Sequence, residues 1–533
     1  RIRCVAGMVI LATHYIAAAG NYNSDDSSIL NKDYDEMLLK FISANTINKS
    51  FLTKYSGDNI SRLSADGSWS KGKLINYYQS DNQVKLGVSA SSIYRIDRRI
   101  VISGGISYAM DRGRNMAGSA FINPEETPFD IIEATDDNPG TKRNEKYMLD
   151  GELGYMFSDR FSMGAMFVYR TENYAKFKDL RHQNTLMNLD LSVGASYGIT
   201  DLMTLGLAYS YNRNLETVFF KIYGNTDRQY SSLISFGGFY GRKELFGESG
   251  YTSDSRPLFT QKHGGALQLL LESNPVNWFN EVYYNTLSGR FGSGASTSIT
   301  YSNHNGYETG YKSKVTINGD GRFHSVELNL DYSSLENNEN SFKESTDQSG
   351  VSQIVYYGSN KVGDRNLFKA RLAYQILIGS KENRSDFKVG SSLGFYSRNV
   401  TSSLYPYYRK QNINAMDLLL KTSRNLFRDK NVYSISVTAG FSTGWGDMKT
   451  DGTYTYVEND KNLPFDRNDL LVKEYDYITS SQIISGLSLM YERGLKADIS
   501  VYTSMEIMYR RALNTSMKGF SHSFMGLAVG VKF

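Results

Sequence analysis

From residue 62 to the carboxyl end, segment after segment of this chain places apolar residues at every second position. The clearest segment, 189–197, alternates Leu189, Leu191, Val193, Ala195 and Tyr197 with polar or small residues. A period of two is the period of a β-strand with two different faces. On many segments the second face carries acids and bases, which suit a water-filled lumen better than a dry core. The pattern therefore predicts the strands of a membrane β-barrel.

The composition agrees with strands rather than helices as the membrane-crossing elements. The chain has 40 Tyr, 27 Phe and 47 Gly but only 7 Pro and 1 Cys. Aromatic residues suit the two interfacial girdles of a barrel, and glycine suits crowded or bulged strands. Mean hydropathy is −0.43, and beyond the amino terminus no run approaches the roughly 18 apolar residues that a spanning helix needs. A helical membrane bundle is excluded.

Short and long connections alternate along the chain, as they do in outer-membrane barrels. Short turns rich in Asp, Asn and Gly occur at 97–98, 158–159, 200–201, 273–277, 318–321, 379–383, 428–430 and 493–496. Long polar stretches occur at 113–145, 216–262, 336–364 and 447–475. Eight turns join about sixteen strands, and 62–72 and 519–533 add one at each end. We expect an all-β, transmembrane, antiparallel up-and-down barrel of about 18 strands (range roughly 16 to 20) in the outer membrane. Residues 229–241 are either part of a loop or a further strand.

The last strand carries a candidate assembly signal. Phe533, Val531, Val529 and Leu527 share one face, and Lys532 lies on the other. A terminal aromatic residue preceded by alternating apolar residues is similar to the signal by which bacterial barrels are recognised for assembly. The alternative is the edge strand of a soluble sandwich.

The first 60 residues differ in pattern from the rest of the chain. Arg1 and Arg3, an apolar run at 5–12 and the small residues 17–20 predict a signal peptide, residues 1–19. Residues 20–60 do not alternate, but 34–42 show helical spacing after Asp33, so we expect one short helix there. This segment either plugs the lumen or lies below the barrel in the periplasm. The barrel is expected to occupy residues 61–533.

Three stretches carry a resemblance to known proteins. Residues 115–122 (NMAGSAFI), 174–182 (YAKFKDLRH) and 151–155 (GELGY) resemble a family of Bacteroidota outer-membrane β-barrel proteins without an assigned function. The resemblance covers most of the mature chain. It implies the barrel fold and the outer membrane, and it supplies no catalytic or binding residues.

No catalytic or metal-binding motif appears, so we predict neither an enzyme nor a cofactor nor a metal site. HExxH and other two-histidine spacings are absent, as are Walker-type loops. The densest polar constellation is Lys176, Lys178, Asp179, Arg181 and His182. It is either a solvated extracellular hairpin held by charge pairs across its strands or a contact for an anionic ligand or lipopolysaccharide phosphate.

Charged residues on the second face of the strands are the candidate lumen residues. They are Asp150, Glu152, Asp190, Lys312, Lys314, Glu327, Asp331, Lys369, Arg371 and Lys388. Because strand order is angular order in a barrel, early acids and later bases should occupy separate arcs. They would either create a transverse field or pair with a plug.

The sequence leaves two functions open. We expect a pore or gated transport channel for polar solutes; the alternative is a non-conducting partner or scaffold barrel of a surface uptake or secretion complex. Expected partners are outer-membrane lipid and lipopolysaccharide, the barrel assembly machinery and other surface proteins. The net charge of only +4 argues against nucleic acid.

Overall fold

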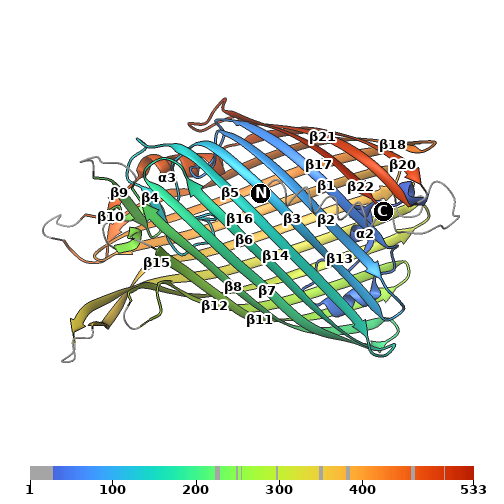
Figure 1. The fold of residues 1–533 in the computed structure, drawn as a ribbon, viewed down its shortest axis with the longest axis horizontal. Helices are drawn as coiled ribbons and strands as arrows, with labels where there is room; N and C mark the ends of the chain where they lie inside the picture. The colour runs from blue at the N-terminus through green and yellow to red at the C-terminus, as the bar shows by residue number, and fades with distance from the viewer. Residues whose placement is uncertain are drawn as a thin grey trace.

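The wall of the molecule is one closed antiparallel sheet of 18 strands (Figure 1). The computed structural model describes residues 28–222, 229–247, 250–253, 255–295, 298–346, 352–379, 384–457, 463–496 and 498–533. The predicted signal peptide lies outside them. The wall strands are β1 (Ile60–Gly72), β2 (Asn82–Arg95), β3 (Ile100–Met116), β5 (Gly140–Met156), β6 (Phe161–Lys176), β7 (Arg181–Thr200), β8 (Met203–Lys221), β11 (Ser255–Ser273), β12 (Val276–Gly292), β13 (Thr300–Gly319), β14 (Arg322–Thr346), β15 (Ser352–Ile378), β16 (Phe387–Leu404), β17 (Tyr407–Arg428), β18 (Asn431–Thr453), β20 (Gln482–Lys496), β21 (Ile499–Ala512) and β22 (Ser521–Lys532). Each strand pairs with the next, and β1 pairs with β22, so the predicted 18-stranded barrel is confirmed.

The two faces of the wall follow the alternation in the sequence. On β8, Leu205, Leu207 and Tyr209 are exposed on the outside, whereas Thr204 and Ala208 are buried on the inside. The same outward apolar side chains recur around the wall, which is how a barrel meets lipid. Among the described residues, no helix is long and apolar enough to cross a membrane. The closed sheet with its outward apolar side chains is that of an outer-membrane β-barrel.

Seven of the eight predicted turns lie where two neighbouring wall strands meet, and the eighth, 379–383, lies outside the described residues from 380 on. One predicted loop was wrong: most of 336–364 belongs to β14 and β15, which stay paired out to Thr346 and Ser352. Figure 1 shows this hairpin projecting beyond the other strands at the lower left. Outside the membrane both faces of a hairpin can be wet, so the apolar alternation that identifies a wall strand is absent there.

Three of the long loops fold together at the loop end of the barrel. They supply β4 (Asp130–Glu133), β9 (Ser231–Ser235), β10 (Tyr240–Leu245) and β19 (Phe465–Asp466), which form a second sheet in the order β19-β10-β9-β4. Helix α3 (Asn468–Thr479) packs through Leu470 and Leu471 on Leu233 of β9. We call this sheet and α3 the cap. Residues 229–241 thus form neither a simple loop nor a wall strand, but part of the cap.

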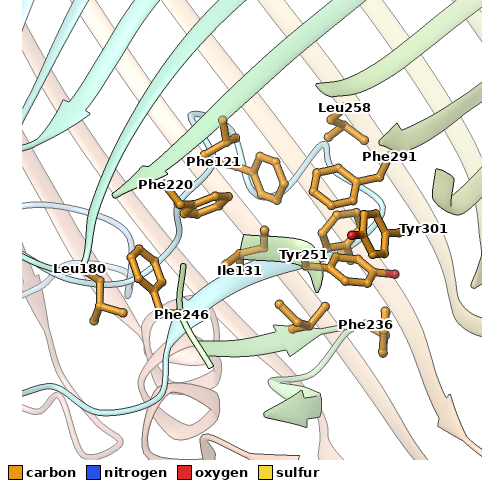
Figure 2. Close-up of a cluster of buried hydrophobic side chains, with 14 of the residues drawn as sticks. Phe121, Ile131, Leu180, Phe220, Phe236, Phe246, Tyr251, Leu258, Phe291 and Tyr301 are labelled. Carbon is orange, nitrogen blue, oxygen red and sulfur yellow. The ribbon is translucent and has the colours of Figure 1, made fainter. Parts of the chain in front are cut away.

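An aromatic cluster fixes the cap to the inside of the wall (Figure 2). Phe129, Ile131, Ile234 and Phe236 come from the cap segments and are at most 3% exposed. They pack with inward residues of the wall, namely Val218, Phe220, Leu258, Phe291 and Tyr301. Phe219 and Tyr209 on the same strand β8 point outward and are exposed, so the cluster lies on the luminal side. The cap therefore occupies the loop end of the lumen.

At the opposite end, residues 28–55, which we call the N-terminal segment, pack against the inner wall. The segment contains the short helices η1 (Ser28–Asn31), α2 (Tyr34–Lys40) and η2 (Lys49–Lys54). The predicted helix is confirmed, and Asp33 caps it by accepting a hydrogen bond from the Glu36 amide at 3.0 Å. At Gly164 of β6, a Cβ would lie 2.1 Å from the backbone of Lys49, so only glycine admits the segment there. Figure 1 shows α2 at the end of the barrel opposite α3.

Candidate functional site

A polar chamber of about 620 Å³ lies inside the barrel, lined by inward residues of β6 to β16 and by residues 122–126, which precede the cap strand β4. Inward residues along β14 show where the chamber lies between the two ends of the barrel. Glu327 lies near the N-terminal segment, since its partner Lys314 donates to the Phe41 carbonyl at 3.2 Å. Asp331 and Ser333 line the chamber, and Asn337 lies opposite the cap. The chamber therefore lies between the N-terminal segment and the cap.

Most charged groups around the chamber already have partners. Lys262 and Glu308 form an ion pair at 2.6 Å. Asp190 accepts from the Asn212 amide at 2.6 Å, and Asp331 accepts from the Tyr283 hydroxyl. Lys369 lines the chamber and makes no ion pair among the described residues. The chamber thus presents amides, phenols and both signs of charge, which suit a small polar solute.

The predicted lumen residues all lie on inward positions, but they divide into groups. Three of them hold the N-terminal segment. Glu152 pairs with Lys49 at 2.8 Å, and Lys388 pairs with Glu36 at 2.5 Å and with Asp33 at 3.6 Å. Lys314 reaches both the segment and Glu327, the latter at 3.0 Å.

The other predicted residues lie on the wall without touching the segment. Lys312 pairs with Glu281 at 3.3 Å. Asp150 lies beside Gly105 of the adjacent strand, and Asp190, Asp331 and Lys369 line the chamber. Arg371 is exposed to the lumen on β15 and makes no ion pair among the described residues. The luminal charges thus both hold the segment and line the chamber.

The predicted loop cluster does not form one solvated hairpin. Lys176 is 2% exposed and is paired with Glu133 of the cap strand β4. His182 is also buried, with its Nδ1 2.8 Å from Asn184 Oδ1, whereas Lys178 is exposed. Asp179 and Arg181 pair at 2.9 Å. Because alternate residues at the strand ends face inward, part of the cluster supports the cap and part faces solvent.

The sequence reasoning missed the residue that fixes η2. Asn48 is fully buried, and its Nδ2 donates to the Ala195 carbonyl at 3.0 Å, the Leu207 carbonyl at 3.2 Å and Gln268 Oε1 at 2.9 Å. Its Oδ1 accepts from the Ser50 amide at 3.1 Å. Asn48 therefore caps η2. Asparagine is a residue type that often caps helices, so this signal was present in the sequence. The contacts to three wall strands had no such signal.

A second missed group joins the segment to the closing strand. Glu492 of β20 is fully buried and accepts from Arg384 at 2.7 Å and from Lys532 at 2.6 Å. The same two bases donate to carbonyls of the N-terminal segment: Arg384 to Leu30 at 3.2 Å and Lys532 to Lys32 at 3.0 Å. A buried carboxylate of this kind is tolerated only because it is paired and hydrogen-bonded. Lys532 is therefore a structural contact rather than a solvated wall residue.

Two carboxyl groups outside the wall have strongly shifted pKa values. Burial disfavours the charged form of Asp33, but the charges of Lys388, Arg384 and Lys532 outweigh it and hold the pKa at about 2. In the cap, burial raises the pKa of Asp130 to about 6, although Ser119 and Tyr77 donate hydrogen bonds to it. Asp33 therefore helps to hold the segment to the wall as an anion, through Lys388.

A model of the "Family of unknown function (DUF6850)" matches residues 50–533. The chain belongs to this family. The match covers every wall strand and the cap, whereas most of the N-terminal segment precedes residue 50. No curated protein matches the chain.

Solved structures similar to this family member are outer-membrane barrels. The ferric preacinetobactin receptor BauA of Acinetobacter baumannii has 10% identity and a TM-score of 0.40, over 90% of this chain and 80% of its own. The Escherichia coli outer membrane transporter YddB has 7% identity and a TM-score of 0.40, over 88% and 80%. The Pseudomonas putida toluene transporter TodX has 10% identity and a TM-score of 0.29, over 95% of both. These similarities are too low to carry a conclusion about function.

Proposed function

We propose that the protein is a gated outer-membrane transporter for small polar solutes. The observation that carries this proposal is a polar chamber of about 620 Å³ with a separate piece of chain at each end. Neither the cap nor the N-terminal segment belongs to the wall, and no disulfide holds them, since the only cysteine is Cys4. Both are therefore able to move while the barrel stays closed. The proposed role involves no covalent chemistry, so we propose that the chain is not an enzyme.

In this proposal the N-terminal segment is the periplasmic gate. It is held by partly hydrated ion pairs, such as Lys54 to Glu272 at 2.5 Å, and by the buried contacts of Asn48 and Glu492 described above. The partly hydrated pairs contribute little individually, so the buried contacts set the cost of moving the segment. Movement of the segment would connect the chamber to the periplasm without opening the wall.

A reversible covalent lock tests whether solute passes by the segment. Thr53 Oγ1 of η2 lies 3.2 Å from Ser162 Oγ of β6, so cysteines at these two positions bring their sulfur atoms close enough to bond. We expect the oxidised T53C/S162C variant in liposomes to admit no small sugar, and the reduced variant to admit it at the native rate. Deleting residues 28–55 should raise the rate above native.

Three results would speak against the proposal. Equal rates in the oxidised and reduced forms would show that solute does not pass the segment. No uptake in any variant, including the deletion, would favour the alternative of a non-conducting partner barrel. A stoichiometric partner pulled down from native membranes would favour the same alternative.

The finer predictions belong to this proposal as well. We propose that the family member is a Bacteroidota protein, that residues 1–19 are a signal peptide, and that the outer surface meets lipopolysaccharide. The supports are the resemblance and the composition described above. Assembly machinery and other surface proteins are the proposed protein partners.

A further inference from the structure

The outer face of the wall has a hollow of about 480 Å³ over β8, β11 and β12, which we call the outer hollow. Arg213 of β8 and Arg290 of β12 line it, and Phe259 of the intervening strand β11 lies between them. Arg213 alternates in step with the exposed Tyr209, so it points outward. Arg290 alternates in step with the exposed Tyr284, and Phe259 is directly opposite Arg290. The outer hollow therefore opens away from the lumen.

On the outer face of β8, β11, β12 and β13, every charged side chain is basic. The acids of these four strands all occupy inward positions, where they contact the N-terminal segment, the chamber or the residues that precede the cap; they are Glu216, Glu272, Glu281 and Glu308. The first acid beyond β13 on the outer face is Glu336 of β14, which pairs with Lys361 at 2.9 Å. The described residues that line the outer hollow thus include two bases and no acid.

The two arginines are held in place without an ionic partner. Their Cζ atoms lie over the ring of Phe259, at 5.5 Å from its centroid for Arg213 and 5.0 Å for Arg290. Neither arginine makes an ion pair with a described residue, and the buried Nε of Arg290 makes no hydrogen bond. A Cβ at Gly294 would lie 2.8 Å from the Arg290 Cζ, so the loop backbone packs against this guanidinium as well. Stacking of this kind orients a guanidinium and leaves N–H groups at its edge for an acceptor.

The outer hollow lies at the edge of the lipid-facing band. Strands β8 and β12 both run from a short turn to the loop end of the barrel. Along each of them the outer face is first apolar, with exposed Leu207 and Val282, then aromatic, with exposed Tyr209 and Tyr284, and only then basic. Outward aromatic residues mark the level of the membrane interface in a barrel. The arginines on the loop side of them therefore lie beside the headgroups of the outer leaflet.

We propose that the outer hollow binds a phosphate group of lipopolysaccharide. A guanidinium binds phosphate through two parallel hydrogen bonds, and two guanidinium groups over one ring can hold one headgroup from both sides. The acyl chains of the same molecule would lie along the apolar residues on the turn side. Soluble phosphate would leave those residues uncontacted, so their position beside the arginines favours a lipid.

The inference deepens the proposal that the outer surface meets lipopolysaccharide, because it names the place and the residues. It rests on that proposal and is independent of the transport function. A test therefore needs no measurement of uptake.

Native mass spectrometry of the detergent-purified barrel tests the inference with three probes. They are lipid A, which is the phosphorylated lipid part of lipopolysaccharide, the same lipid A without its phosphates, and inorganic phosphate. We expect phosphorylated lipid A to bind more tightly than the dephosphorylated form. Arg213→Gln and Arg290→Gln should each weaken its binding roughly tenfold to a hundredfold, the value of a hydrogen bond to a charged group.

The matched control is Arg511→Gln. Arg511 is also exposed on the outer face near the loop end, but it belongs to β21 and does not line the outer hollow. The same substitution there should leave the binding of lipid A at the native level. Unchanged mobility on unheated gels checks that each variant is folded.

The possible contrary results are distinguishable. If the native barrel does not bind lipid A, both this inference and the proposed contact with lipopolysaccharide are wrong. If lipid A binds but neither arginine substitution weakens it, or if removal of its phosphates has no effect, only the assigned site is wrong. Displacement of lipid A by an equal concentration of inorganic phosphate would show a site for soluble anions instead. A native dimer that becomes a monomer in the double variant would show that a second copy covers this face.

Discussion

Asp33 shows at the scale of one residue how the N-terminal segment is held. Its pKa of about 2 lies below the ordinary 3.8 because Lys388, Arg384 and Lys532 outweigh the effect of burial. The ionised form therefore favours the seated segment. This contribution, about 2 kcal/mol, is fully present above pH 4 or so and is lost as the pH falls towards 2.

We expect the seated segment to loosen between pH 4 and pH 2. Asp33→Asn should remove this part of the pH dependence, because asparagine caps a helix about as well as aspartate but carries no charge. The measurement is hydrogen exchange of the amides of α2 as a function of pH. Identical pH profiles for the native protein and the variant would contradict the assigned role of Asp33.

Residue types alone could not identify these contacts. Glu152, Lys314 and Lys388 lie on the face that alternation along their strands assigns them, because alternation is a local property. Which of them meet the N-terminal segment and which line the chamber depends on residues hundreds of positions away. The same holds for Asn48 and Gln268, which are ordinary polar residues in the sequence and form a hydrogen bond at 2.9 Å only in the folded barrel.

At the scale of elements, the wall strands were predictable and the cap was not. A wall strand meets lipid on one face and the lumen on the other, so apolar and polar residues alternate along its own sequence. The cap strands β4 and β9 are buried on both faces and only four or five residues long, which leaves no alternation to read. Helix α3 also lay in a predicted loop, although Leu471, Tyr475 and Ile478 follow helical spacing.

The helix α3 provides a test of the cap as a separate unit. Leu471 is fully buried against the cap sheet, whereas Val472 beside it is 36% exposed. We expect Leu471→Ala to destabilise the cap by about 2 to 5 kcal/mol while the wall is unaffected. Hydrogen exchange should become faster in β9 and stay slow in β6. Val472→Ala is the matched control and should change neither; faster exchange throughout the wall after Leu471→Ala would show that cap and wall unfold together.

At the scale of the whole molecule, the decisive feature is the seam between β1 and β22. The backbone of Phe533 closes it, since its amide donates to the Ser61 carbonyl at 3.0 Å and its carbonyl accepts from the Ser61 amide at 2.7 Å. The side chains of Leu527, Val529 and Phe533 are exposed on the outer face, as the candidate assembly signal requires.

Removing Phe533 should therefore reduce the amount of inserted barrel. The truncation deletes the two hydrogen bonds that Phe533 makes with Ser61 and the outward aromatic ring, whereas Phe533→Tyr keeps these bonds and an aromatic ring and should insert normally. The measurement is the fraction of heat-modifiable protein in outer-membrane preparations. Native amounts of folded barrel from the truncated gene would show that neither the seam bonds nor the signal at Phe533 is needed.

The two bases on Glu492 have a consequence for the alignment of the first and last strands. A slip of two residues at the seam would keep every side chain on its proper face, so the alternation of polarity alone does not exclude it. It would shift β1, and the N-terminal segment that leads into it, by roughly 7 Å relative to β22. Lys532 would keep Glu492, since β20, β21 and β22 stay in register, but Lys532 would lose the Lys32 carbonyl and Arg384 would lose the Leu30 carbonyl. These two hydrogen bonds thus distinguish the correct alignment of first and last strands from its nearest well-patterned competitor.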